Sequence, residues 1–324
     1  MKYRLLGNSG LKVSALGLGT NAFGKRADAN TSKAIIHYAL DHGITFIDTA
    51  NIYAGTESEK IIGDALKGRR HEAVLTTKAG LPRGPGPYER GSSRRHLTLE
   101  LEQSLKRLGT DYVDLYQIHT FDPETPLEET LRTLENMIQS GKVRYIGASN
   151  YYAWELMKAV GISDRLGLNR FVSMQTSYSL ADRTPERELI PMCVDQGIGI
   201  IPYFPLAGGI LTGKYSASQG APVDSRAITD PNFQRFLSKE RIQFGSQVGQ
   251  MASRLESTAS ALSLAWLMQQ PQVCTVIVGA TTVEQLRDNL NSNILELDAA
   301  TLAELNQLSE QFRHGDPFAI YRLS

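Results

Sequence analysis

The sequence predicts an α/β fold, a (β/α)8 TIM barrel with an N-terminal β-hairpin before it and an extra C-terminal helix after it. Eight short apolar runs alternate with segments of helical periodicity down to about residue 292. The runs are apolar throughout, as expected for parallel strands that are covered on both faces. Eight successive strand–helix units close into a barrel, whereas fewer units would leave an open sheet.

The predicted hairpin consists of Tyr3–Leu6 and Leu11–Val13, joined by a glycine-containing turn. Thr31 is expected to cap the first helix, because apolar residues recur on one helical face after it. Trp154 and Trp266 lie within helical patterns and are expected in the core. The predicted barrel strands are Ser14–Gly17, Thr45–Asp48, Val74–Lys78, Asp114–Ile118, Tyr145–Ser149, Val172–Gln175, Gly199–Tyr203 and Thr275–Gly279. Further helices are expected at 97–108, 127–138, 257–269 and 299–312, with long loops at 79–91 and 204–245.

Composition narrows the class of protein. With 41% hydrophobic and 21% charged residues, the chain can bury a large core, and we expect one domain over residues 1–324. The net charge of zero gives no reason to expect a nucleic acid or a membrane surface as partner. Cys193 and Cys274 are too few and too isolated for a disulfide framework or a zinc site. Because no signal peptide or membrane-spanning run is present, we expect a cytoplasmic protein without a bound metal.

Four polar residues lie at or just after the ends of successive apolar runs: Asp48, Tyr53, Lys78 and His119. If the runs are parallel strands, all four side chains reach one rim of the barrel, which is where barrel enzymes have their active sites. Taken one at a time, each residue also has an ordinary structural interpretation, as a helix cap, a solvated cation, a packing aromatic or a structural histidine. Their joint placement favours catalysis.

These four side chains suit proton transfer to a carbonyl oxygen. A free tyrosine has a pKa of ~10, and a nearby ammonium lowers that pKa. Lys78 is expected to supply the ammonium, and Asp48 to keep Lys78 protonated. Tyr53 would then act as general acid in reduction and as general base in oxidation. A neutral His119 would donate a hydrogen bond to the carbonyl oxygen. An alternative is an aldolase that uses Lys78 as a Schiff-base nucleophile.

Longer stretches of the chain resemble the aldo-keto reductase family. They include GLGTNAFG at 17–24, FIDTANIYAGTESEKIIGDAL at 46–66, LTTKAG at 75–80, DLYQIHTFD at 114–122, VRYIGASN at 143–150, SMQTSYSL at 173–180, YFPLAGGILTGKY at 203–215 and VIVGATTVEQLRDNL at 276–290. The resemblance implies that Asp48, Tyr53, Lys78 and His119 form the family's catalytic tetrad. It also implies transfer of the 4-pro-R hydride of NADPH to a small carbonyl compound, without a metal.

The later strand ends offer groups that suit a nicotinamide ring. Amide and hydroxyl groups of Ser149, Asn150 and Gln175 can bind its carboxamide, and Tyr203 can stack on the ring. Ser149 and Asn150 could instead cap the helix that contains Trp154. The small residues of Pro205–Lys214 can cradle a pyrophosphate with backbone N–H groups. The expected cofactor site also includes Thr20, Asn21, Asp48, Phe204, Leu206, Gly208, Lys214 and Arg226.

A helix is expected to follow Gly279, and its N-terminus would attract a phosphate. The resemblance assigns Gly279, Thr281 and Gln285 to the adenosine phosphate, and Asp288 and Asn289 to the adenine. Many family members carry Arg or Lys at position 281 or 282, where this chain has threonine. Lys214 and Arg226 can replace that cation, so NADP(H) is expected and NAD(H) remains open.

The cofactor stretches also resemble the beta subunits of voltage-gated potassium channels, which offer a non-catalytic alternative: a nicotinamide-binding regulatory subunit. Such subunits typically have asparagine where this chain has His119, which favours the enzyme. Phe23, Tyr53 and His119 are expected to contact the substrate. The identity of the substrate, the direction of the reaction and the choice between monomer and homo-oligomer stay open.

Overall fold

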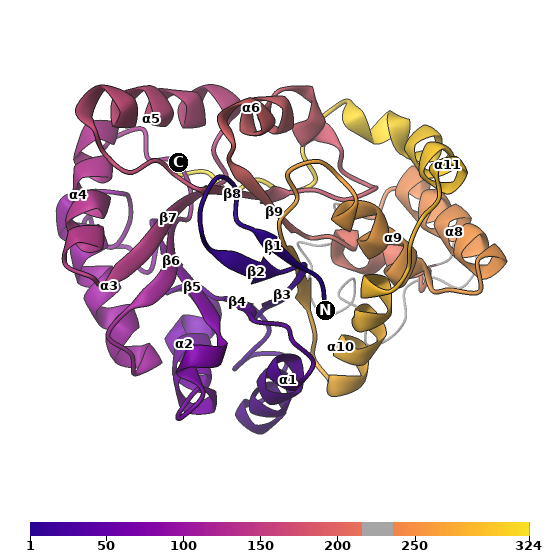
Figure 1. The fold of residues 1–324 in the computed structure, drawn as a ribbon, viewed down its shortest axis with the longest axis horizontal. Coiled ribbons are helices and arrows are strands. Elements are labelled where there is room, and N and C mark those ends of the chain that lie inside the picture. Colours follow the sequence, from indigo (N-terminus) through magenta and orange to yellow (C-terminus); the bar gives the residue numbers. More distant parts are fainter. Residues whose placement is uncertain (216–235, 324) are drawn as a thin grey trace.

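A computed structural model describes residues 1–215 and 236–323 and shows a nearly closed barrel of eight parallel strands with a separate antiparallel hairpin (Figure 1). The hairpin strands are β1 (Tyr3–Leu5) and β2 (Lys12–Ser14). Around the barrel the order is β10-β3-β4-β5-β6-β7-β8-β9, and one parallel bridge between Ile200 and Val273 brings the two edges together. The barrel strands are β3 (Leu16–Gly19), β4 (Phe46–Asp48), β5 (Val74–Ala79), β6 (Val113–Ile118), β7 (Val143–Ser149), β8 (Ser173–Ser177), β9 (Gly199–Tyr203) and β10 (Val276–Gly279).

The helices form an outer ring around the strands (Figure 1). The α-helices are α1 (Ala29–Asp41), α2 (Glu57–Ala65), α3 (Arg94–Leu108), α4 (Leu127–Gln139), α5 (Ala153–Leu166), α6 (Leu189–Gln196), α8 (Lys239–Arg254), α9 (Ala259–Met268), α10 (Val283–Leu290) and α11 (Ala299–Ser309). The 3-10 turns are η1 (Tyr53–Thr56), η2 (Arg70–Glu72), η3 (Thr184–Arg187), η4 (Ala207–Thr212), η6 (Asn291–Asn293) and η7 (Glu310–Arg313). Among the described residues, no helix has both the length and the apolar character needed to cross a bilayer.

The predicted fold class, hairpin and extra helix are confirmed, and four local predictions are corrected. Ser14 ends β2, where its hydroxyl accepts hydrogen bonds from the backbone N–H groups of Thr45 and Phe46, and the first barrel strand starts only at Leu16. Asp28, not Thr31, caps α1, since its carboxylate accepts the N–H of Thr31. A carboxylate three residues nearer the N-terminus accepts the free N–H group at the start of the helix.

The third correction concerns the two tryptophans. Trp266 is fully buried in α9, as expected, but Trp154 is 59% exposed. Trp154 lies on the outward face of α5 with Met157, Lys158 and Gly161, whereas the buried face of the helix carries Glu155, Leu156, Ala159, Val160 and Ser163. The predicted loop 204–245 also contains the start of α8 at Lys239.

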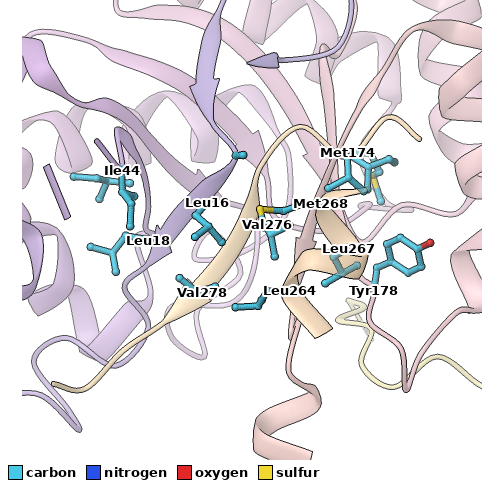
Figure 2. Close-up of a cluster of buried hydrophobic side chains, with 14 of the residues drawn as sticks. Leu16, Leu18, Ile44, Met174, Tyr178, Leu264, Leu267, Met268, Val276 and Val278 are labelled. Carbon is cyan, nitrogen blue, oxygen red and sulfur yellow. The ribbon is translucent and has the colours of Figure 1, made fainter. Parts of the chain in front are cut away.

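Two layers of apolar side chains hold the barrel together. The larger layer lies between the strands and the helices, where Leu16 and Val276 of the sheet meet Leu264 and Leu267 of α9 (Figure 2). The smaller layer fills the amino end of the barrel, where Leu6 and Val13 of the hairpin region join inward-facing residues of the strands. The hairpin lies across this end (Figure 1). The carboxyl ends of the strands are therefore the end left for a site.

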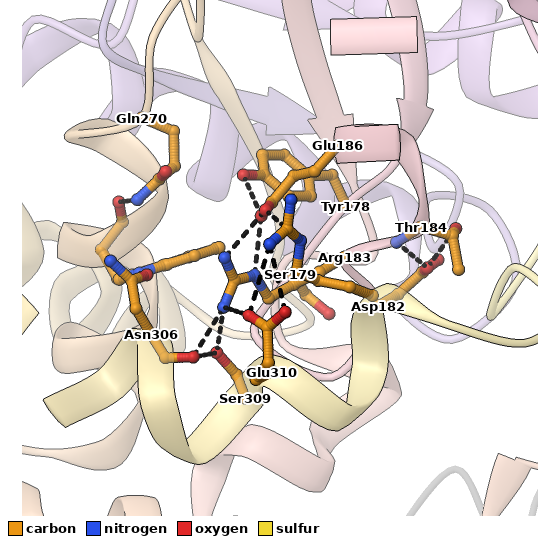
Figure 3. A network of polar contacts seen from close by, with 12 residues as sticks. Tyr178, Ser179, Asp182, Arg183, Thr184, Glu186, Gln270, Asn306, Ser309 and Glu310 are labelled. Atoms are coloured by element: carbon orange, nitrogen blue, oxygen red, sulfur yellow. Dashed lines mark hydrogen bonds and ion pairs between the residues drawn. The ribbon is translucent and has the colours of Figure 1, made fainter. Parts of the chain in front are cut away.

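The C-terminal helix α11 is attached through one buried arginine. Arg183 donates to the backbone oxygen of Asn306 at 2.8 Å and to the hydroxyl of Ser309 at 2.9 Å. Its remaining nitrogens pair with both oxygens of Glu186 at 2.7 and 2.8 Å (Figure 3). Because a guanidinium can make several fixed hydrogen bonds at once, this one side chain helps to fix the C-terminal end of α11, from which the tail continues.

Candidate active site

The carboxyl ends of β4, β5 and β6 bring the four predicted catalytic residues together. Asp48 is the last residue of β4, Lys78 lies near the end of β5, and His119 directly follows β6. Tyr53 begins η1 in the loop after β4. All four therefore reach the same rim, as the sequence predicted.

Strained backbone follows Tyr53. Ala54, Gly55 and Thr56 have φ values of 50°, 63° and 87°, so two non-glycine residues adopt a left-handed conformation in succession. Each such residue costs on the order of 1–3 kcal/mol, and this kind of strain is concentrated at functional sites. The turn therefore indicates that the position of Tyr53 is fixed at the expense of local stability.

Lys78 and Asp48 form a buried ion pair at the centre of the site. Lys78 is 0% exposed and Asp48 is 3% exposed. The ammonium donates to Oδ2 of Asp48 at 2.6 Å, to the backbone oxygen of Thr49 at 2.8 Å and to the hydroxyl of Tyr53 at 3.4 Å. Three acceptors match the three hydrogens of an ammonium. This geometry leaves no free amine on Lys78, which argues against the Schiff-base alternative.

Two glutamines complete the coordination of Asp48. Its Oδ1 accepts hydrogen bonds from Nε2 of Gln175 at 2.9 Å and of Gln117 at 3.3 Å. Gln175 was expected to bind the cofactor, and here it also orients the carboxylate. Gln117 was not identified from the sequence, although it lies two residues before His119 and in register with Lys78. Alternation of side chains along β6 could have placed it on the inner face.

The pKa of Tyr53 departs from the expected direction. It lies well above the ordinary value of 10.0, because burial, the Asp48 carboxylate and the Tyr321 phenol all favour the protonated phenol. The expectation that the Lys78 ammonium lowers this pKa overlooked desolvation, which dominates here. Burial also lowers the pKa of Lys78 from 10.5, and the Asp48 carboxylate opposes that change. Tyr53 therefore holds its proton firmly in this arrangement.

His119 is neutral, as expected. Burial and the Lys78 charge lower its pKa well below 6.5. The imidazole meets the Tyr53 ring edge-on, with ring centroids 6.0 Å apart. Its Nδ1 is buried and has no hydrogen-bond partner in the described structure. An unsatisfied buried nitrogen costs about 1–3 kcal/mol, which a polar ligand could recover.

The carboxyl ends of β7 and β9 carry Ser149, Asn150 and Tyr203. The amide nitrogen of Asn150 donates to the hydroxyl of Ser149 at 3.0 Å and to the backbone oxygen of His119 at 2.9 Å. The Tyr203 hydroxyl lies 2.7 Å from Oδ1 of Asn150. Neither Ser149 nor Asn150 caps α5, whose first cap position is Tyr152. These side chains therefore belong to the site and not to a helix terminus.

The segment after β9 has the small residues and unusual backbone that a phosphate cradle needs. Phe204, Ala207, Gly208 and Gly209 all have positive φ. A side chain at Gly209 would lie 2.7 Å from Cε of Lys214, so only glycine lets this lysine fold back over the loop. The expected contacts Pro205 and Leu206 lie in the same segment, whereas Arg226 falls outside the described residues.

The N-terminus of α10 lies after β10, as predicted. Thr282 caps the helix by accepting the N–H of Gln285, and Gln285 in turn accepts the N–H of Thr281. Gln285 and Asp288 are exposed and Asn289 is buried. Gly279 is exposed at the end of β10, so this rim can be reached by a ligand.

Two of the remaining predicted contacts are used for other purposes. Phe23 is 0% exposed and packs in the core, so it cannot contact a substrate as expected without a rearrangement. The hydroxyl of Thr20 donates to the backbone oxygen of Asp48 at 2.8 Å and accepts from Ser58. Thr20 therefore stabilises the carboxyl end of β4, where Asp48 lies. Asn21 is exposed.

Comparison with known proteins agrees with this geometry. The sequence model of the Aldo/keto reductase family matches residues 15–310. An uncharacterised oxidoreductase of Bacillus subtilis (strain 168) is 39% identical, covering 95% of this chain and 96% of that protein. A probable voltage-gated potassium channel subunit beta of Arabidopsis thaliana is 38% identical, covering 90% and 91%. L-glyceraldehyde 3-phosphate reductase of Escherichia coli (strain K12) is 35% identical, covering 95% and 92%.

We predict that the Lys78–Asp48 pair is strongly coupled. Lys78→Met leaves a buried carboxylate unpaired and should lower the free energy of unfolding by about 3–5 kcal/mol. Adding Asp48→Asn removes that charge, so the double variant should be more stable than Lys78→Met alone. Urea unfolding of the four proteins gives the coupling energy. Lys67→Met is the matched control, because its side chain is 79% exposed in a surface pair with Asp64. Additive effects of the two substitutions would contradict the prediction.

We further predict a loss of stability in acid that depends on His119. The folded state resists protonation of His119 and the unfolded state does not, so protons favour unfolding below a pH of 6.5. From about pH 7.5 to about pH 5.5 the wild type should lose roughly 1 kcal/mol more than His119→Gln. Urea unfolding at both pH values measures the difference. Equal losses in the two proteins would show that His119 titrates normally in the folded state.

Proposed function

The chain belongs to the aldo/keto reductase family, and from this premise we propose that it is an NADP(H)-dependent oxidoreductase that interconverts a carbonyl compound and its alcohol. The observation that carries the proposal is the buried ammonium of Lys78, which bridges the Asp48 carboxylate and the Tyr53 hydroxyl. We propose Asp48, Tyr53, Lys78 and His119 as the catalytic residues and a small aldehyde or ketone as the substrate. A cytoplasmic location is proposed with it.

Tyr53 would move the proton. The nicotinamide cofactor, when bound, supplies or accepts the hydride. As negative charge develops on the carbonyl oxygen, Tyr53 donates its proton to that oxygen, and in oxidation Tyr53 takes the proton back. A raised pKa does not prevent this step, because an alkoxide is a stronger base than a phenolate. Lys78, 3.4 Å from the hydroxyl, then stabilises the phenolate that is left behind.

His119 and the walls of the site would position the carbonyl. A neutral imidazole can donate one hydrogen bond to the oxygen. Because hydride donor and acceptor must be close and aligned, this positioning contributes a large part of the rate enhancement.

The residues present fit a nicotinamide dinucleotide. Ser149, Asn150 and Gln175 would bind the carboxamide and Tyr203 would lie against the ring. The glycines of η4 and the capped N-terminus of α10 offer backbone N–H groups for the phosphates. Burial and the neighbouring Arg26 both lower the pKa of Lys214. Two cations held near each other suit a highly charged phosphate, and for this reason we prefer NADP(H) to NAD(H).

The regulatory-subunit alternative keeps one supporting observation, the likeness to the Arabidopsis thaliana protein named as a potassium channel subunit beta. His119 favours the enzyme, because the channel subunits typically have asparagine at this position.

We predict that Tyr53→Phe removes most of the turnover and leaves NADPH binding almost unchanged. Loss of a general acid costs about 10²–10⁴-fold in rate. Turnover is measured as oxidation of NADPH by an activated aldehyde such as 4-nitrobenzaldehyde, and binding by titration of NADPH fluorescence. Tyr145→Phe is the matched control, since it changes a partly buried tyrosine at the opposite end of the barrel. A fully active Tyr53→Phe protein would refute the assignment of the acid.

A further inference from the structure

The C-terminal tail lies across the rim of the site as a strap. The N–H of Phe318 donates to the buried carboxylate of Asp182 at 2.9 Å. The backbone oxygen of Ala319 lies 3.0 Å from the Tyr203 hydroxyl, and that of Tyr321 accepts from Thr120 at 2.6 Å. The strap is residues 318–323. Its hydrogen bonds reach three segments at the strand ends, each of them more than 100 residues away in the sequence.

The far end of the strap is fixed by an ion pair between Arg322 and Glu155. Glu155 is 1% exposed and lies in the first turn of α5, where it accepts the N–H of Tyr152 at 2.8 Å. Arg322 donates to both oxygens of this carboxylate through two different nitrogens. The pairing raises the pKa of Arg322 above its already high usual value. A buried carboxylate needs such a partner, so the fork of Arg322 is held in one place.

The guanidinium of Arg322, fixed by Glu155, also contacts Asn150. One nitrogen of Arg322 donates to the backbone oxygen of Asn150 at 2.9 Å, and the N–H of Tyr321 donates to its Oδ1 at 3.3 Å. Asn150 is 3% exposed and has a φ of 56°, in the left-handed region, which asparagine adopts more readily than most other non-glycine residues. The strap supplies two of the contacts that hold it.

Asn150 connects the strap to His119 and Tyr203. Its amide nitrogen donates to the backbone oxygen of His119, and its Oδ1 lies within hydrogen-bonding distance of the Tyr203 hydroxyl. One residue therefore connects the histidine that would meet the carbonyl with the aromatic ring that would meet the nicotinamide. A change in the backbone of Asn150 would move both.

We propose that Glu155 and Arg322 are a positioning pair that fixes Asn150, and through it His119 and Tyr203, for the nicotinamide end of the cofactor. This inference rests on the proposed function. Neither residue touches the reacting atoms. The pair should therefore affect the Kd of ligands that carry a nicotinamide ring and leave the Kd of ligands without this ring unchanged.

The test uses a double variant, Glu155→Gln with Arg322→Met, which removes both charges without leaving a buried carboxylate unpaired. The matched control is Glu128→Gln with Arg165→Met, an exposed pair that joins α4 to the same helix α5 at 3.4 Å. Binding is measured by calorimetry with two probes, NADPH and 2′-phospho-ADP-ribose, which is the same molecule without the nicotinamide ring.

We expect the Kd for NADPH to rise about three- to tenfold in the Glu155–Arg322 variant, the effect of disturbing one or two hydrogen bonds. The Kd for 2′-phospho-ADP-ribose should stay at the control value. Arg322→Lys keeps the charge but not the planar fork, so its Kd for NADPH should fall between those of the wild type and the double variant. A merely structural pair would not distinguish the two probes.

Equal weakening of both probes, or no weakening of either, would overturn the proposal. Turnover separates it from the proposed function. If the wild type binds NADPH but reduces no carbonyl compound, the proposed function is wrong. The inference about Glu155 and Arg322 is then still tested by whether the variant weakens NADPH binding more than 2′-phospho-ADP-ribose binding. If the reductase is active and the difference is absent, the inference fails alone. A wild type that binds neither probe would overturn both.

Discussion

The site is organised around one buried charge, the ammonium of Lys78. Removing an ammonium and a carboxylate from water is costly, and the attraction between them compensates only when their other hydrogen-bonding positions are filled. Lys78 meets this condition with Asp48, Thr49 and Tyr53. Asp48 meets it with Gln117 and Gln175 from two further strands. The curvature of the barrel contributes to this arrangement, because it brings Gln175 of β8 to Asp48 of β4, four strands away in the sheet.

Desolvation has opposite consequences for the neighbours of this pair. It raises the pKa of Tyr53 and lowers that of His119, so both groups are neutral and both carry a proton that they can share. A neutral phenol and a neutral imidazole beside the Lys78 cation can stabilise negative charge on an oxygen, while the Asp48 carboxylate is engaged by Lys78 and the two glutamines. Such fixed dipoles and charges are effective where water is excluded.

Much of this arrangement follows from sequence pattern alone. Buried parallel strands have a plain apolar signature, and polar residues directly after them must meet at one rim, which is why Asp48, Lys78 and His119 were located correctly. Pattern fails where the cause is three-dimensional. The pKa of Tyr53 depends on burial, the exposure of Trp154 depends on which face α5 turns outward, and the role of Arg322 depends on a strap with no periodicity. Gln117 could have been predicted from the sequence, because it pairs with Lys78 on the neighbouring strand.

The most direct measurement follows the hydride. NADPH carrying deuterium at the 4-pro-R position is mixed with the wild-type protein and 4-nitrobenzaldehyde, and the alcohol is analysed by NMR. The account predicts one deuterium on the carbinol carbon, delivered directly while Tyr53 protonates the oxygen. An alcohol without deuterium, or bound NADPH that stays unoxidised beside the aldehyde, would contradict it.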